Sequence, residues 1–256
     1  MCILLAAWRD HPDYELVVAA NRDEFHSRPS AVAAAWPDAP HVVAGRDLEA
    51  GGTWLGVEHG GRFAAVTNVR RPGQAAGQRS RGALVADFLR ERHAAAHYGE
   101  RLVANAAHYA GANLIFADTT NLRAWSNQDN RVRDLGPGVY GLSNAALDDE
   151  WPKVARLKAA YRRHRALDGE ALIDALLATL CDDAGADDHE LPDTGIGVAM
   201  ERVLAPIFIN GGGYGTRCSS VVLREHGGRL VFVERRYDAA GRACGDSRHV
   251  LETARC

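Results

Sequence analysis

The hydrophobic pattern predicts a strand hairpin at the start of the chain. An apolar run begins at Cys2, the turn sequence His-Pro-Asp occupies residues 11–13, and a second apolar run covers residues 14–20. Proline and aspartate favour turns, and a nearly continuous apolar run suits a strand that is covered on both faces. The second strand ends in Asn-Arg-Asp-Glu at 21–24. We therefore expect Cys2 and this tetrad to lie at one edge of a sheet.

Further strands are expected along most of the chain. A loop is predicted at residues 25–40, because prolines at 29, 37 and 40 interrupt regular structure. Short apolar runs and hairpin turns then predict strands at residues 41–45, 53–57, 62–68, 113–118, 122–127, 131–134, 139–142, 219–224 and 230–236.

Four segments have the apolar spacing of amphipathic helices. The first follows the expected cap Ser80 and carries Leu84, Val85, Phe88 and Leu89 on one face. The others cover residues 98–109, 151–165 and 172–180. Sequential hairpins with helices in pairs predict an α+β fold, a four-layer αββα sandwich of two antiparallel sheets. No internal boundary is evident, so residues 1–256 are expected to form a single domain.

Composition narrows the class of protein. The chain has 256 residues, of which 46% are hydrophobic and 25% charged, enough for a substantial core. The formal net charge of -3 argues against a nucleic-acid partner, which would require a basic face. No window approaches the ~18 apolar residues of a transmembrane segment, and the opening residues lack the pattern of a secretory signal. We expect a soluble cytoplasmic protein.

Three features of the sequence are considered as metal or ligand sites. The five cysteines are an odd number without CxxC spacing, which argues against a disulfide framework and a zinc site. The acidic segment 181–190 lacks calcium-binding spacing and is interpreted as a solvated loop, so no metal is expected. Segment 69–82 carries four arginines, including Arg70, and is either a flap for an anionic substrate or a solvated loop.

Cys2 is the main candidate for chemistry. If the initiator Met is removed, its thiol and a free α-amine belong to one residue. Their pKa values, ~8.5 and ~7.7 to 8.0, allow proton exchange at neutral pH without a separate histidine. The alternative is that Cys2 is a small hydrophobic residue of the core.

Several motifs together carry a resemblance to a known family. They are Met-Cys-Ile at the start, Asn-Arg-Asp-Glu at 21–24, Thr-Trp-Leu-Gly at 53–56, Thr-Asn at 67–68, Leu-Ser-Asn at 142–144, Leu-Pro-Asp-Thr-Gly at 191–195 and Tyr-Gly-Thr-Arg at 214–217. In this order, over nearly the whole chain, they resemble the NRDE family. The resemblance implies a fold similar to N-terminal-nucleophile hydrolases, with proposed roles in haem trafficking and in handling acyl-CoA or other lipids.

The resemblance also implies roles for individual residues. In the similar bile-salt hydrolases and penicillin V acylases, the mature chain starts at a nucleophilic cysteine, matched here by Cys2, with an aspartate beside it, matched by Asp23. The arginine of that branch falls on Ala20, and Arg22 is the nearest substitute. Asn68 and Asn144 resemble the asparagines that support the oxyanion and the substrate. Arg217 is a candidate cation near the thiol.

The remaining candidates have structural alternatives. Asn21 binds substrate and Asp23 orients the α-amine by hydrogen bonding, or both cap a turn. Arg22 and Glu24 contact substrate or form an ion pair that fixes the end of the hairpin. Trp54 is a substrate platform or, more simply, part of the core.

Two functions follow, from different classes. The first is a hydrolase that cleaves an amide or thioester of an acyl conjugate through Cys2, Asp23 and Asn144 and needs no cofactor. The second is a non-catalytic protein that carries haem, acyl-CoA or another lipid in the same cleft. The arginines of segment 69–82, Arg70 among them, suit the second, because guanidinium groups bind carboxylates and phosphates well.

Overall fold

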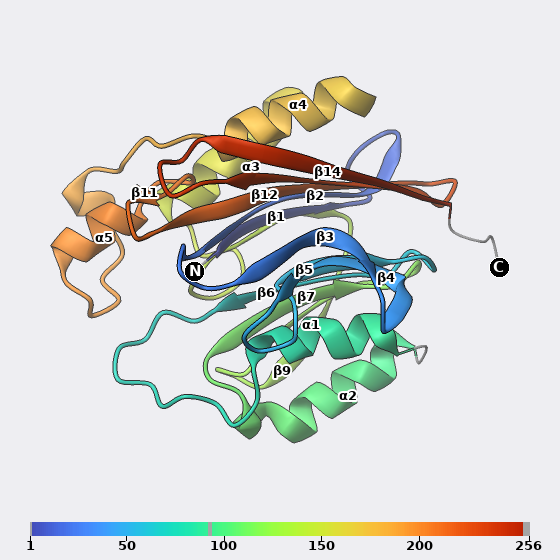
Figure 1. Cartoon of the computed structure of the whole chain (residues 1–256), viewed down its shortest axis with the longest axis horizontal. Coiled ribbons are helices and arrows are strands. Elements are labelled where there is room, and N and C mark those ends of the chain that lie inside the picture. Colours follow the sequence, from blue (N-terminus) through green and yellow to red (C-terminus); the bar gives the residue numbers. More distant parts are fainter. Residues whose placement is uncertain (1, 92–93, 253–256) are drawn as a thin grey trace.

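The computed structural model describes residues 2–91 and 94–252. Two seven-stranded antiparallel sheets pack face to face, and helices cover the outer face of each sheet (Figure 1). The predicted αββα sandwich is thereby confirmed. No helix in these two ranges has both the length and the apolar character needed to cross a membrane.

The first sheet contains the N-terminal hairpin at its centre. Its strand order is β10-β1-β2-β12-β13-β14, and β11 pairs with β12. The strands are β1 (Cys2–Trp8), β2 (Tyr14–Phe25), β10 (Gly138–Leu142), β11 (Asn210–Gly211), β12 (Tyr214–Glu225), β13 (Arg229–Tyr237) and β14 (Ala243–Glu252).

The second sheet is a meander in chain order from β3 to β9. Its strands are β3 (Ser30–Trp36), β4 (Ala39–Asp47), β5 (Leu55–Glu58), β6 (Phe63–Asn68), β7 (Ala112–Ala117), β8 (Leu122–Ser126) and β9 (Arg131–Leu135).

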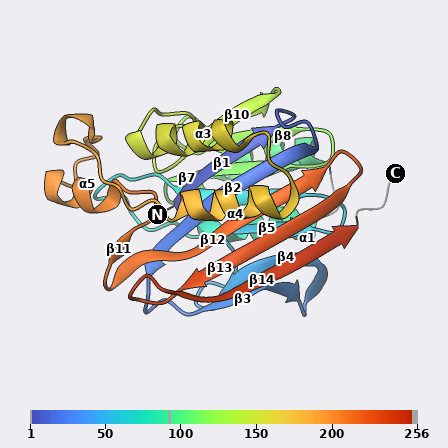
Figure 2. The ribbon, with the colours of Figure 1, turned by 90° about the horizontal axis from the view of Figure 1, so that it is seen from above.

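Helices form the two outer layers. The α-helices are α1 (Arg81–Arg90), α2 (Ala95–Asn105), α3 (Pro152–His164), α4 (Gly169–Leu180) and α5 (Val198–Leu204), with short 3-10 turns at Ala106–His108 and Asp188–Glu190. Figure 2 shows α3 and α4 lying over β1, β2 and β12. Helices α1 and α2 cover the second sheet, and α5 lies at the end of the molecule where β1 begins (Figure 1).

Three elements differ from the sequence-based expectation. Strand β3 and the start of β4 occupy more than half of the predicted loop at residues 25–40. Pro29 and Pro37 flank β3 without interrupting it, and β3 is an edge strand with two bulges, where fewer ladder bonds are needed. Strand β14 was missed because it is an exposed, polar edge strand. Helix α5 has 7 residues, too few for a periodic signal.

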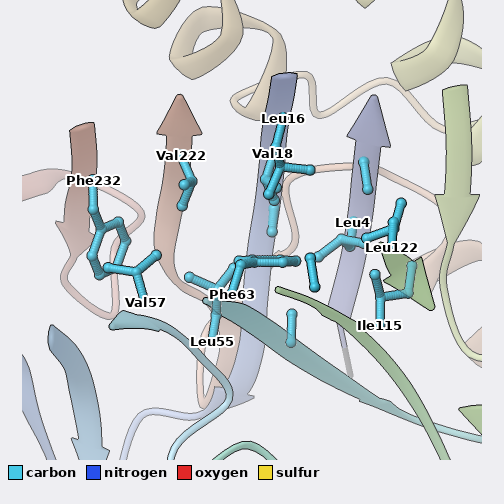
Figure 3. Packing of buried hydrophobic residues seen from close by; sticks show 14 of the residues in the cluster. Leu4, Leu16, Val18, Leu55, Val57, Phe63, Ile115, Leu122, Val222 and Phe232 are labelled. Carbon is cyan, nitrogen blue, oxygen red and sulfur yellow. The ribbon is translucent and has the colours of Figure 1, made fainter. Parts of the chain in front are cut away.

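The core positions the N-terminal hairpin rigidly. Along β1, Leu4, Ala6 and Trp8 face the second sheet, and the intervening residues face α3 and α4. Between the sheets, Leu4, Leu16, Val18, Val222 and Phe232 meet Leu55, Val57, Phe63, Ile115 and Leu122 (Figure 3). Each such side chain contributes roughly 1.5–3 kcal/mol when it is buried. The same alternation places Cys2 on the face toward the second sheet.

Candidate active site

The register of the N-terminal hairpin decides which candidate residues face each other. Cys2 pairs with Arg22, and Ile3 pairs with Asn21. Cross-strand partners point to the same face of a sheet, and neighbours along a strand point to opposite faces. Cys2 and Arg22 therefore face the second sheet, whereas Asn21 and Asp23 face the helices.

A cleft of about 510 Å³ lies where the end of this hairpin meets the second sheet. Six of the predicted site residues line it: Cys2, Arg22, Asp23, Glu24, Trp54 and Asn68. Part of the arginine-rich loop also lines it, through Arg79 and Arg81. The loop thus borders the cleft, as the flap interpretation requires.

Competing electrostatic effects act on the pKa of the Cys2 thiol. Burial raises its pKa, and the Asp23 carboxylate acts in the same direction. A hydrogen bond from the Asp23 backbone N–H and the charge of Arg22 oppose this rise. The prediction that the initiator Met is removed concerns a residue outside the described ranges.

Asp23 is anchored by the Tyr-Gly-Thr-Arg motif on β12. Thr216 Oγ1 donates a hydrogen bond to Asp23 Oδ1 at 2.8 Å, and the Tyr214 hydroxyl donates one to the Asp23 backbone carbonyl at 3.1 Å. Burial raises the pKa of the Asp23 carboxyl, while the positive charges of Lys153 and Arg70 lower it. The Asn-Arg-Asp-Glu and Tyr-Gly-Thr-Arg motifs, which lie far apart in the sequence, are therefore joined by hydrogen bonds at this site.

Lys153 is a residue of the site that the sequence analysis missed. Only 2% of it is exposed, and its Nζ donates a hydrogen bond to the Leu204 carbonyl at 2.9 Å. Burial lowers its pKa to about 8, and the charges of Asp23 and Cys2 oppose that effect. The sequence did contain a signal, since Lys153 lies four residues before Leu157 and eight before Tyr161, on the apolar stripe of α3.

Asn144 and Asn68 are joined by two hydrogen bonds, and Asn144 is the donor in both. Asn144 Nδ2 donates to the Asn68 carbonyl at 3.1 Å and to Asn68 Oδ1 at 3.0 Å. Ser143 Oγ links this pair to the hairpin, because it donates to the Cys2 carbonyl at 3.1 Å. The two predicted asparagines are thus brought together beside Cys2, with Asn68 on the cleft side.

Arg70 is committed to a buried ion pair. Its guanidinium binds the Glu201 carboxylate, and the two side chains are 5% and 3% exposed. It also donates to Asn144 Oδ1 at 3.3 Å. The other Glu201 oxygen accepts bonds from the backbone N–H and hydroxyl of Thr194, at 3.0 and 2.5 Å. The Leu-Pro-Asp-Thr-Gly motif is therefore tied through Glu201 and Arg70 to the asparagine pair.

Arg22 stacks on Trp54. The guanidinium carbon lies 4.2 Å from the ring centroid, which is a cation–π geometry. Trp54 approaches Gly45 so closely on β4 that a Cβ there would lie 2.3 Å from the ring. Trp54 lines the cleft and also packs on the core, so its packing role is confirmed and its role as a substrate platform stays a prediction.

Two predicted residues have other surroundings. Asn21 donates to the Leu180 and Ile207 carbonyls at 2.8 and 2.9 Å and accepts from Ser219 Oγ at 2.6 Å, which places it beneath the helices. Arg217 binds the Phe25 and Arg28 carbonyls at 2.8 and 3.0 Å. It lines a separate small cavity that it shares with Arg22.

Glu24 has a different ion-pair partner from the one considered. Its carboxylate lies 4.0 Å from Arg28 Nε. Among the ion pairs of residues 2–91 and 94–252, none joins Arg22 to Glu24, so the suggested pair at the end of the hairpin is wrong. The stacking explains this, because Arg22 is held over Trp54 and cannot also reach the strand end.

A larger cavity of about 670 Å³ lies beyond the asparagine pair. Its walls include the apolar side chains of Leu114, Trp125, Leu142 and Leu147, and its polar lining includes Arg70, Arg71, Arg133 and Asn144. Across the described part of the chain, no group of three His, Cys, Asp or Glu side chains could hold a metal ion.

Comparison with known sequences gives a consistent result. The model of the family described as Transport and Golgi organisation 2 matches residues 1–239. The chain is 36% identical over 259 residues to the Transport and Golgi organization protein 2 homolog of Bos taurus, and 35% identical over 261 residues to that of Homo sapiens. Each alignment covers 92% of both proteins.

Comparison with solved structures supports the fold. An N-acylethanolamine-hydrolyzing acid amidase ortholog of Caenorhabditis elegans matches with a TM-score of 0.50 and 10% identity, over 87% of this chain and 92% of that one. A mutant conjugated bile acid hydrolase from Clostridium perfringens matches with a TM-score of 0.52 and 11% identity, over 98% and 92%. Both have the N-terminal-nucleophile hydrolase fold, and at this identity the likeness concerns the fold alone.

Proposed function

The chain belongs to the Transport and Golgi organisation 2 family, also known by its NRDE motif, and from that premise we propose that it is a cysteine hydrolase. Its substrate is an acyl conjugate with an amide or thioester bond. The observation that carries the proposal is the position of Cys2, which lines a cleft opposite Arg22 and accepts a hydrogen bond from the Asp23 backbone. A cysteine kept only for packing would not need to border a polar cleft.

The proposed reaction has two stages. The Cys2 thiolate attacks the carbonyl carbon, a C–S bond forms, and the thiol proton passes to the α-amine of the mature chain. Asn68 Nδ2 is the better placed oxyanion donor, because it borders the cleft while Asn144 Nδ2 already donates to two oxygens of Asn68. The amine or thiol leaves with a proton, and water then hydrolyses the acyl-enzyme to a carboxylic acid and regenerates the thiol.

The larger cavity suggests where the acyl group binds. Its apolar wall suits a hydrocarbon chain, and Arg71 and Arg133 at its polar lining suit an anionic group. An amphipathic, anionic acyl conjugate matches both features.

A second function is favoured by a different observation. Burial raises the pKa of the Cys2 thiol, which reduces the thiolate fraction at neutral pH. The same cavities could then serve a carrier of acyl-CoA or haem. For haem, the arginines of the larger cavity could hold propionates, but among its described lining residues there is no histidine, cysteine or methionine to bind the iron.

One pair of variants separates the two functions. Cys2→Ala should abolish turnover of a panel of N-acyl amides and acyl thioesters, because the nucleophile is lost, while ligand affinity is retained. The matched control is Cys181→Ala, since Cys181 is an exposed free cysteine far along the chain. Intact mass of the purified protein first establishes whether Cys2 is the mature N-terminus.

The outcomes are distinct. Turnover lost in Cys2→Ala and kept in Cys181→Ala supports the hydrolase. If processed wild-type protein turns over no member of the panel, and it binds acyl-CoA or haem as tightly as Cys2→Ala does, the hydrolase proposal is wrong and the carrier replaces it.

A further inference from the structure

A third cavity, of about 140 Å³, lies on the far side of the stacked pair Arg22 and Trp54. Its lining includes Cys218 on β12, Glu234 and Arg236 on β13, and Arg217. Neither the family resemblance nor the proposed reaction gives these side chains of β12 and β13 a role in the cavity. Pockets for whole drug-sized ligands run to ~300–1,000 Å³, so this one suits only a small group.

The cavity is part of a single row of residues across the first sheet. Cys2 pairs with Arg22, Arg22 with Cys218, Cys218 with Arg236, and Arg236 with Gly245. Directly opposed residues in an antiparallel sheet have Cβ atoms ~4.5–5.5 Å apart and share a face. The row therefore connects the Cys2 cleft to the third cavity through Arg22, which lines both.

The charges in this cavity do not balance. Three guanidinium groups, those of Arg22, Arg217 and Arg236, face one carboxylate, Glu234. One oxygen of Glu234 accepts the Ala33 backbone N–H at 2.9 Å. Burial also raises the pKa of Glu234, which weakens it as a counter-ion.

Two guanidinium nitrogens in the cavity have unmet hydrogen-bonding capacity. Arg22 Nη1 and Arg236 Nε are buried and have no hydrogen-bond partner among the described residues, and Arg22 as a whole is 5% exposed. A buried donor without a partner costs about 1–3 kcal/mol, and more when it is charged. An oxyanion between the two side chains would satisfy both donors and reduce the charge imbalance.

Gly245 permits the position of Arg236. A Cβ at this residue would lie 2.3 Å from Arg236 Nη2, so only glycine leaves room for the guanidinium on the neighbouring strand. Arg236 is thus held over the sheet at the cavity and not extended into solvent.

We infer that this cavity binds a small oxyanion, a carboxylate or a phosphate group, between Arg22 and Arg236. Guanidinium forks bind both groups through paired, charge-assisted hydrogen bonds. The inference does not depend on a reaction at Cys2. It implies that an anion in this cavity changes the position of Arg22 over Trp54. Because Arg22 also lines the neighbouring cleft, the anion then changes the lining of that cleft.

The test uses inorganic phosphate and acetate as separate probes. Each is titrated into the purified full-length protein at constant ionic strength, with binding followed by calorimetry and by tryptophan fluorescence. We expect saturable binding of at least one probe, and the comparison of the two identifies the preferred class. Trp54→Phe should remove the fluorescence change and keep the heat of binding. Cys2→Ala should bind as wild type does, which separates this inference from the hydrolase proposal.

Two variants are expected to change the affinity for the anion in opposite directions. Arg236→Gln should weaken binding at least tenfold, and Glu234→Gln should tighten it several-fold, because it removes the competing carboxylate. Arg248→Gln is the control and should leave the affinity unchanged, because Arg248 is an exposed arginine on β14 that pairs with Glu170. Absence of saturable binding of both probes overturns the inference. So does unchanged affinity in a folded Arg236→Gln, or weaker binding in Glu234→Gln.

Discussion

Asn144 Nδ2 donates to two oxygens of Asn68, the backbone carbonyl at 3.1 Å and Oδ1 at 3.0 Å. The two asparagines are therefore not equivalent. Accepting at Oδ1 fixes the orientation of the Asn68 amide, whose Nδ2 has no acceptor among the described residues. Asn68 lines the cleft with Cys2, and Asn144 holds it in place from behind.

This asymmetry predicts different losses for the two alanine variants. Asn68→Ala should lower kcat by about 10²–10³, the usual effect of one oxyanion donor, with little change in stability. Asn144→Ala should lower the free energy of unfolding by roughly 1–3 kcal/mol, because buried partners lose their hydrogen bonds. Steady-state kinetics and urea unfolding distinguish the two. Equal effects of both variants on kcat and stability would contradict the assignment.

The buried pair of Arg70 and Glu201 should be sensitive to removal of either partner. Arg70→Met or Glu201→Gln leaves a nearly buried charge without its counter-ion, which typically costs about 3–5 kcal/mol. The double variant should recover part of that loss. Urea unfolding of the four proteins measures the coupling. The exposed pair Arg248 and Glu170 provides the control, where the same cycle should give less than about 1 kcal/mol.

Lys153 predicts a distinctive dependence of stability on pH. Its pKa is about 8 in the fold and 10.5 as the ordinary value, so the unfolded chain binds more protons between these two pH values. Stability should therefore rise with pH across that window, by on the order of 3 kcal/mol. In Lys153→Met this rise is absent.

The measurement compares the free energy of unfolding of wild type and Lys153→Met at intervals from pH 7.5 to 10.5. The difference between them should shift in favour of wild type as the pH rises, because only wild type loses a buried positive charge in this range. Lys158 is the only other lysine in the chain, and Lys158→Met is the matched control. A difference that does not change with pH would refute the role given to Lys153.

Asn21 should matter for stability and not for ligand binding. Asn21→Ala leaves the Leu180 and Ile207 carbonyls and the Ser219 hydroxyl without their bonds to its amide, so we expect a loss of roughly 2–4 kcal/mol. Affinity for a bound acyl conjugate should be unchanged in the folded fraction. Asn121→Ala, at an exposed turn, should change stability by less than about 0.5 kcal/mol. A weakened affinity at unchanged stability would contradict this assignment and indicate that Asn21 contacts the ligand.

The layered fold could be predicted because its signal is local. Apolar alternation and turn residues identify most strands, and the apolar stripe of α4 identifies a helix without any tertiary information. The edge strands β3 and β14 carry little of that signal. Their pairing is decided by the neighbouring strand and not by their own sequence.

The site could be predicted only in part, because its geometry depends on register. Cys2 is predicted from its place at the start of the chain, and Asn68 and Asn144 from the family resemblance, and the fold brings the three together. The sequence could not place Arg22 opposite Cys2, since a shift of one residue reverses the faces of a whole strand. Nor could it pair Arg22 with Cys218 on β12, almost two hundred residues away.

The position of β1 between β2 and β10, with β12 beyond β2, also sets the order of events during synthesis. The strand that bears Cys2 leaves the ribosome before its partners do. Its outer neighbour is Gly138–Leu142, and the residues that hydrogen-bond Asp23 belong to Tyr214–Glu225. Until Tyr214–Glu225 has been synthesised, the nascent chain carries its thiol without the partners that assemble around it. The cleft can therefore form only after this late strand has paired with β2.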